Sequence, residues 1–252
     1  MAKRRSFPIA IDKWDSSFFK TPIARLTLSG RKGRTHFAEE MAGLISLAKR
    51  KKIGYLVIKL ENPGIFYSRD LLRLGMKLCG ESIDLKFTYR LNKKKDPSSG
   101  YYINLVKPCE IEKIKAIASD AFRRSFLYRC GFGKKMEIDR YHATWVENLS
   151  KDKDACIFIA KENNTVIGFL ALKINKSERY GRIILIAVHK RYRAKGAGSA
   201  LVHRCIEWGN KKIGSIFVKT QKDNRNAIIL YKKMGFKLIG TDKVFCKKIS
   251  GR

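Results

Sequence analysis

The residues best suited to chemistry form the loop at 193–198, which reads Arg-Ala-Lys-Gly-Ala-Gly. A hydrophobic strand is predicted before it, at 183–188, and a helix after it, from Ser199 to about Lys211. The glycines let backbone amides approach a ligand closely, and the helix start adds unpaired N–H groups and partial positive charge. Arg193 and Lys195 add full charges. The loop is therefore suited to binding a pyrophosphate, although an ordinary strand-to-helix turn could have this composition.

A second segment follows the same order, with a strand predicted at 215–220 and then a helix. This segment carries Asn224, Ala227, Tyr231, Gly235 and Phe236. Neither of the better-known phosphate motifs, Gly-x-x-x-x-Gly-Lys-Ser/Thr and Gly-x-Gly-x-x-Gly, occurs in the chain. Together the two segments resemble the acetyl-CoA-binding core of the Gcn5-related N-acetyltransferases. The family commonly has Pro and Gly where this chain has Lys190 and Ala194. The matching residues are Val188, Arg193, Gly196, Gly198, Asn224, Ala227, Tyr231, Gly235 and Phe236.

The resemblance implies an acetyl-CoA-dependent enzyme of mixed α/β fold, with a mixed sheet and direct transfer of the acetyl group to an amine. It implies that Tyr231 is the general acid. With an ordinary pKa of about 10, a tyrosine is a neutral donor able to protonate a leaving thiolate. The alternative is a tyrosine that only packs the helix against the sheet. The residues implied to bind the coenzyme are Ile186, Ala187, Val188, Arg193, Ala194, Lys195, Gly196, Ala197, Gly198, Ser199, Asn224 and Ala227.

The base that takes the proton from the amine is not assigned, because the strand at 183–188 carries no carboxylate. A water chain to backbone carbonyls is an equal alternative. Asn224 is expected to cap its helix and to touch the pantetheine arm, although the cap alone would explain an asparagine there. The side chains within reach as a base are His142, Glu147, Glu178, Tyr180 and His189.

Further stretches bear on the acceptor: the start Trp14-Asp15-Ser16-x-Phe18-Phe19, residues 118–126 and 141–148, and Gly181-Arg182-Ile183 with Thr220-Gln221. Together these stretches resemble the TDP-fucosamine acetyltransferase family. The resemblance implies a small-molecule acceptor, the amino group of a nucleotide-linked 4-amino-4,6-dideoxy sugar. Core packing is an equal alternative for the aromatic residues that would line the acceptor pocket. These are Trp14, Phe18, Phe126, Tyr141 and Trp145.

The charge of the chain bears on the rival functions. The chain has 55 Lys and Arg against 22 Asp and Glu, a formal charge of +33, and such a field attracts polyanions. The basic residues are spread along the chain, which indicates solvated faces that also steer anionic substrates. Repulsion of basic peptides argues against lysine acetylation, but a protein N-terminal or lysine acetyltransferase stays an alternative. A nucleic-acid-binding protein on the same scaffold is the less favoured alternative, and a homodimer is left open.

Composition limits the class of protein. With 252 residues and 44% hydrophobic residues, the chain can bury one large core or two small ones. No apolar run reaches the roughly 18 residues of a membrane span, and the N-terminus lacks a signal-peptide pattern, so we expect a cytoplasmic protein. The six cysteines are scattered, without Cys-x-x-Cys. We therefore expect them to be small apolar fillers, with no disulfide and no metal site.

An internal repeat divides the chain. Shifted by 160 residues, positions 51–80 have nine identities with the later segment, among them Lys-Lys-Ile-Gly at 51–54 and 211–214. We therefore predict a degenerate half-domain at 1–100, used as scaffold and acceptor-side wall, and a catalytic domain at 101–252. In the first copy, Gly33 to Ala38 stands at the pyrophosphate loop and Leu71 stands in place of Tyr231. Its helix at 68–78 and a linker at 93–100 are further predictions.

Overall fold

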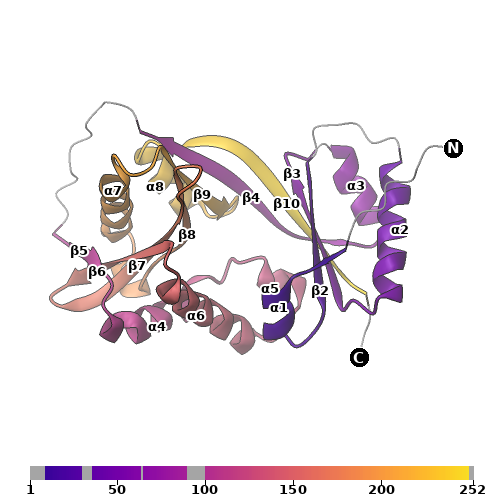
Figure 1. Ribbon diagram of the computed structural model, residues 1–252, viewed down its shortest axis with the longest axis horizontal. Helices are drawn as coiled ribbons and strands as arrows, with labels where there is room; N and C mark the ends of the chain where they lie inside the picture. Colours follow the sequence, from indigo (N-terminus) through magenta and orange to yellow (C-terminus); the bar gives the residue numbers. More distant parts are fainter. Residues whose placement is uncertain (1–8, 30–35, 64, 90–99, 250–252) are drawn as a thin grey trace. The chain divides into compact units, whose positions relative to one another are not determined.

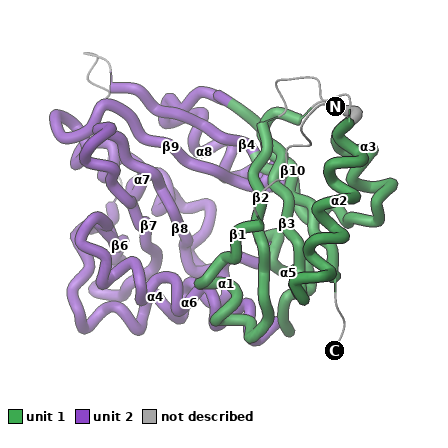
Figure 2. Tube along the Cα trace, turned by 45° about the vertical axis from the view of Figure 1, so that its right-hand side comes forward, with its two compact units in different colours: residues 1–82, 125–134, 240–252 green, residues 83–124, 135–239 purple. Residues whose placement is uncertain are grey.

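The computed structural model describes residues 9–29, 36–63, 65–89 and 100–249 (Figure 1). The chain forms two compact units, drawn in two colours in Figure 2. No described helix is both long and apolar enough to cross a membrane. Unit 1 comprises residues 1–82, 125–134 and 240–252, and unit 2 comprises residues 83–124 and 135–239.

Unit 1 is a sheet covered by helices. Its hydrogen-bonded strand order is β1-β2-β3-β10-β4, with β2 parallel and β10 antiparallel to β3. Apolar side chains at helical spacing on α2, including Met41 and Leu44, pack on Leu56 and Ile58 of β3. The elements are β1 (Ala10–Ile11), α1 (Lys13–Phe18), β2 (Ile23–Ser29), α2 (Phe37–Arg50), β3 (Tyr55–Glu61), α3 (Ile65–Arg73), α5 (Leu127–Cys130), the start of β4 (Lys77–Thr88) and most of β10 (Lys237–Lys248).

Unit 2 is a sheet between two helical layers, with strand order β4-β9-β8-β7-β6-β5. The helices α4 and α6 share one hydrophobic cluster with the sheet, and α7 and Tyr231 of α8 share another. The elements are β5 (Tyr102–Leu105), η1 (Pro108–Glu110), α4 (Ile111–Ala121), α6 (Lys135–Lys151), β6 (Ala155–Glu162), β7 (Thr165–Asn175), β8 (Tyr180–Val188), η2 (Lys190–Tyr192), α7 (Ala197–Gly209), β9 (Ser215–Gln221) and α8 (Arg225–Lys233).

The repeat seen in the sequence is present in the secondary structure. The starts of α2, β3, α3 and β4 precede those of α7, β9, α8 and β10 by 160 residues each. We call residues 37–88 the first repeat and residues 197–248 the second repeat. The last strand of each repeat is shared between units: the end of β4 lies beside β9 in unit 2, and most of β10 pairs with β3 in unit 1. The compact units therefore differ from the consecutive segments 1–100 and 101–252.

Several local predictions can be compared with the structure. The mixed α/β fold is confirmed, and β6 and β7 form an antiparallel hairpin. The helix predicted at 68–78 was wrong in its bounds, because α3 ends at Arg73 and Gly75, at φ 72°, turns the chain into β4. Residues 93–99 of the predicted linker and residues 33–35 of the segment Gly33 to Ala38 lie outside the described residues.

The cysteine prediction was wrong. Cys130 and Cys246 form a disulfide in unit 1, and the buried Cys79 lies beside them. The spacing of the cysteines in the sequence does not indicate this disulfide, because its two residues are 116 positions apart. The folding of unit 1 brings them together from α5 and β10. The cysteines described as free are Cys79, Cys109, Cys156 and Cys205.

Candidate functional site

The middle of β8 is irregular. In its ladder with β7, two successive β7 residues face Ile183 and Leu185, so Ile184 between them has no partner. Ile184 and Leu185 both contact the cluster of α4 and α6, whereas Ile183 and Ile186 contact the cluster of α7. A strand normally alternates faces, so two neighbours on one face identify a β-bulge. Bulges bend a strand and raise its twist, and they are frequent next to active sites.

Beyond this bulge, β8 and β9 are no longer paired. Their parallel ladder runs from Tyr180 opposite Ser215 to Ile183 opposite Val218 and goes no further in these fully described strands. The residues that follow in β8, 184–188, have β7 on one side only. The backbone of the predicted coenzyme-binding residues Ile186, Ala187 and Val188 therefore has an edge that another extended chain could use.

Two buried polar atoms mark the ends of these strands. Nδ1 of His189, just after β8, and Oε1 of Gln221, the last residue of β9, have no hydrogen-bond partner. A buried polar atom left unpaired costs about 1 to 3 kcal/mol. Two such atoms at the ends of adjacent strands fit a site whose hydrogen bonds are completed by a ligand. Gln221 was not predicted as a site residue; its place at the end of a strand before a helix was the signal.

The loop after β8 has the backbone that its glycines suggested. Ala194 has φ 63° and Gly196 has φ 95°, and α7 begins at the next residue, Ala197. Ala194 therefore keeps a left-handed conformation that favours glycine, at a cost of about 1 to 2 kcal/mol. Nε of Arg193 donates to the carbonyl of Val188 at 3.0 Å. The hydroxyl of Tyr101 donates to the carbonyl of Lys195 at 2.9 Å and fixes the other end of the turn.

The start of α7 is suited to an anion. Its first N–H groups, at Ala197, Gly198 and Ser199, have no partner within the helix by geometry, and the helix dipole adds positive potential. A Cβ added to Gly198 would lie 3.4 Å from Cδ2 of Leu230, so the glycine leaves room between α7 and α8. Lys195 Nζ lies 5.8 Å from the centre of the Tyr192 ring. The predicted loop residues 193–199 thus lie together and fit a pyrophosphate group.

The helix α8 presents the second predicted set. Asn224 occupies its N-cap position, but its side chain makes no capping bond and donates to Oγ1 of Thr220 at 3.3 Å. The expected side-chain cap is therefore wrong, because the asparagine amide turns back towards β9. Ala227 is half-buried against the core shared with α7.

Tyr231 is one of the largest fully buried side chains of the protein. It is 2% exposed, and its ring lies 5.4 Å from that of Phe236. Burial, with a smaller contribution from Cys205, raises the pKa of Tyr231 well above its usual value. Among the described residues its hydroxyl has no hydrogen-bond partner. The phenol therefore stays protonated, as a general acid must, while the packing role accounts equally for the ring.

The candidate bases have different surroundings. Glu147 pairs with Lys151 at 2.7 Å and Lys115 at 3.3 Å, and these partners lower its pKa. His142 is buried on α6, where burial lowers its pKa, and its Nδ1 lies 2.9 Å from the carbonyl of Ile138. Glu178 is exposed in the turn before β8, and Tyr180 begins that strand. Of the five, only His189 lies at the carboxyl end of β8.

The predicted acceptor residues belong to different units. Trp14, Phe18 and Phe126 lie in unit 1, and Tyr141 and Trp145 lie in unit 2. Within unit 1 the Trp14 and Phe18 rings are 5.8 Å apart, and within unit 2 the Tyr141 and Trp145 rings are 5.9 Å apart. No single unit brings all five together. An acceptor pocket built from them stays a prediction.

Comparison with known proteins identifies the same region. Residues 112–236 match the model of the acetyltransferase (GNAT) family. An uncharacterized N-acetyltransferase of Methanocaldococcus jannaschii is 29% identical over 147 residues, 53% of this chain and 62% of that protein. Streptothricin acetyltransferase A of Bacillus subtilis is 34% identical over 104 residues, 41% of this chain and 57% of that protein. The chain thus spans less than two thirds of these relatives.

Solved structures extend the likeness in fold to most of the chain. A protein of unknown function from Staphylococcus epidermidis has a TM-score of 0.61 at 15% identity, covering 90% of this chain and 84% of its own. A tandem GNAT protein from the clavulanic acid biosynthesis pathway has a TM-score of 0.59 at 13% identity, covering 92% of this chain and 77% of its own. The specific likeness to TDP-fucosamine acetyltransferases finds no support among these relatives.

Proposed function

We propose that this chain transfers an acetyl group from acetyl-CoA to a primary amine, because residues 112–236 match the model of the acetyltransferase (GNAT) family, whose members use acetyl-CoA as the acetyl donor. One observation carries the proposal: β8 and β9 stop pairing at Ile183 and Val218, beside a glycine loop that opens α7. The free edge of β8 suits an amide-containing arm, and the adjacent loop suits a pyrophosphate, so together they match a ligand that has both.

We assign binding residues to each part of acetyl-CoA. The amides of 196–199, with Arg193 and Lys195, would hold the pyrophosphate, and the free edge of Ile186, Ala187 and Val188 would bind the amide-containing arm. Asn224 and Ala227 would line the other side of that arm. The bound donor supplies an activated thioester carbonyl. The chain itself contributes position, exclusion of water and proton transfer.

Two protons have to move during the transfer. An acceptor amine with a pKa of about 8 must lose a proton before it attacks, and the departing thiolate must gain one. We assign the second step to Tyr231, whose O–H is neutral and buried. For the first step the structure offers His189, whose unpaired Nδ1 lies at the end of β8. A water chain to backbone carbonyls stays the alternative.

For the acceptor we propose the amino group of a nucleotide-linked amino sugar. The formal charge of +33 favours an anionic acceptor over a basic peptide. The residue pattern of the first 20 positions and of α6 supports the same acceptor class. One relative, an N-alpha-acetyltransferase of Sulfurisphaera tokodaii, is 30% identical over 105 residues, 37% of this chain and 62% of that protein. A protein N-terminus is therefore the second candidate.

Calorimetric titration with acetyl-CoA, followed by a thiol-release assay, tests the proposal. The assay panel contains nucleotide-linked amino sugars and short peptides with free N-termini. We expect one coenzyme per chain and turnover on the amino sugars. Turnover on peptides alone would replace the acceptor but keep the reaction. Absence of coenzyme binding, together with salt-dependent binding of RNA or DNA, would overturn the reaction itself and favour nucleic-acid binding. A cytoplasmic location stays a prediction.

A further inference from the structure

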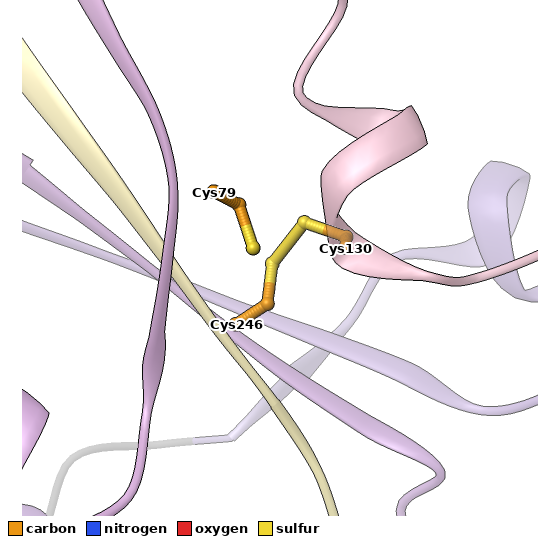
Figure 3. A group of neighbouring side chains, drawn as sticks. All are labelled: Cys79, Cys130 and Cys246. Carbon is orange, nitrogen blue, oxygen red and sulfur yellow. A yellow bond between two sulfur atoms is a disulfide. The ribbon is translucent and has the colours of Figure 1, made fainter.

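Three cysteines far apart in the sequence come together in unit 1 (Figure 3). Cys79 lies on β4, Cys130 ends α5 and Cys246 lies on β10. Their sulfur atoms all lie within 4.8 Å of one another, and all three residues are buried. Cys130 and Cys246 are joined as a disulfide, and Figure 3 shows the sulfur of Cys79 pointing towards that bond.

The fold holds each sulfur in place. Phe132, two residues after Cys130, has its ring 5.7 Å from that of Phe19 and 5.0 Å from that of Tyr55. The hydroxyl of Tyr55 donates to the carbonyl of Gly131 at 2.6 Å. The short α5 segment is thereby fixed to the sheet of unit 1. On the sheet side, Cys246 is opposite Val57 in the β10–β3 ladder.

The disulfide joins Cys130 and Cys246, so it does not explain why a third cysteine, Cys79, lies beside them. Cys79 is fully buried, and its thiol donates to the carbonyl of Lys77 at 3.5 Å. The matching position of the second repeat is Ile239, so the strand itself does not require a thiol there.

From this arrangement we propose that the reduced cluster is a zinc site, with Cys79, Cys130 and Cys246 as three thiolate ligands and an exogenous fourth ligand. Zinc–sulfur bonds of about 2.3 Å in a tetrahedron place sulfurs about 3.8 Å apart, a spacing these side chains can reach once the disulfide opens. Soft thiolates select zinc over hard cations.

The disulfide and the metal exclude each other, so the redox state decides the occupancy. A dithiol reductant transfers two electrons and two protons to the Cys130–Cys246 bond; it becomes a disulfide itself, and the chain gains two thiols. Zinc then displaces three protons from the three thiols and forms three zinc–sulfur bonds. Oxidation of the Cys130 and Cys246 sulfurs by a disulfide oxidant reverses the sequence and releases the ion.

The test uses the full chain, reduced without oxygen, freed of reductant and titrated with Co²⁺ and then Zn²⁺. We expect one Co²⁺ per chain with thiolate-to-cobalt charge-transfer absorption, which zinc abolishes by displacement. Zinc absorption spectroscopy should show three sulfur neighbours at about 2.3 Å. The oxidised chain, with the disulfide intact, should bind neither ion at the same concentrations.

Variants locate the site. Cys79→Ser should leave the disulfide able to form but weaken zinc binding by more than the roughly 10- to 100-fold that loss of an outer-shell contact costs. The exposed Cys109 is the matched control, and Cys109→Ser should bind zinc as the unaltered chain does. If Cys79→Ser does not fold, Cys130→Ser on the short α5 provides the second test. Absence of thiolate-to-cobalt absorption in the folded, reduced chain, or unchanged affinity in Cys79→Ser, would overturn the proposal.

Discussion

The two repeats have the same secondary structure and different chemistry. Each has a helix, a strand, a second helix and a long strand, with starts that differ by 160 residues. Position 71 is a leucine with no exposed surface, and its counterpart Tyr231 is 2% exposed. Gly198 in the second repeat corresponds to Ala38 in the first, and Gly196, just before the second repeat, corresponds to His36. The fold is thus maintained by apolar periodicity, whereas the site depends on a few residues that the fold does not need.

The pair Leu71 and Tyr231 gives this difference a physical meaning. Both side chains fill the core beneath the second helix of their repeat. A leucine is sufficient there, so packing alone does not require a hydroxyl at position 231. A hydroxyl that packing does not require fits a task outside stability, and proton transfer is the task we propose.

The largest expected effect is on stability in the first repeat. Leu71→Ala should lower the free energy of unfolding of unit 1 by about 3 kcal/mol, because it leaves a cavity in a closed core. Denaturant unfolding measures the loss. The rate per folded molecule should not change, since Leu71 lies in the first repeat, which is proposed to lack the residues of the chemistry. Leu78→Ala, at a side chain 37% exposed, is the control with a smaller effect. Loss of activity beyond the folded fraction would assign chemistry to the first repeat.

Tyr231→Phe is the corresponding change in the second repeat. The ring stays and the hydroxyl is lost, so coenzyme affinity and stability should be kept while kcat falls by about 100-fold or more. Steady-state thiol release and calorimetry separate the two quantities. Tyr89→Phe is the matched control. Tyr89 is a half-buried tyrosine of unit 2 whose hydroxyl donates to the carbonyl of Ile206 at 2.8 Å, so the change removes a hydroxyl that has no proposed role in the reaction. Equal kcat in Tyr231→Phe and the unaltered chain would leave Tyr231 a packing residue.

A smaller effect is expected at the loop. Gly198→Ala places a methyl group where the backbone would approach the pyrophosphate, so the Kd for acetyl-CoA should rise about 10-fold, equivalent to about 1.4 kcal/mol. Stability should hold, because the new Cβ meets only Cδ2 of Leu230 at 3.4 Å. The mirror change, Ala38→Gly, should cost about 1 kcal/mol of stability and create no coenzyme affinity. A Kd unaffected by Gly198→Ala would remove this part of the loop from the donor site.

Much of this organisation could be predicted from the sequence, and the parts that could not share a cause. The loop at 193–198 and the repeat depend on the order and spacing of residues along the chain, and these can be recognised in the sequence. The bulge at Ile184 and the end of the β8–β9 ladder depend on pairing across strands. The disulfide joins residues 116 apart, and the unpaired atom of Gln221 becomes visible only once its neighbours surround it. Contacts made by tertiary packing carry no local signal.

The smallest expected effect concerns the layer of α4 and α6, which belongs to neither repeat. His142 lies on α6, stacks on Phe122 at 5.0 Å, and has a pKa that burial lowers from 6.5. Below about pH 6.5 the unfolded chain binds a proton that the folded chain refuses, so the stability of unit 2 should fall as pH drops, by less than about 1 kcal/mol at pH 6. Denaturant unfolding at several pH values measures this slope, and His142→Gln should flatten it.

The exposed His36, outside α6, supplies the control for this slope. His36→Gln removes an exposed imidazole, so the pH dependence of the unfolding of unit 2 should be the same as in the unaltered chain. If His142→Gln kept the full slope, the acid sensitivity would belong to carboxylates, whose loss of charge also destabilises folded proteins at low pH. A flattened slope would instead assign the acid sensitivity to the α4 and α6 layer of unit 2.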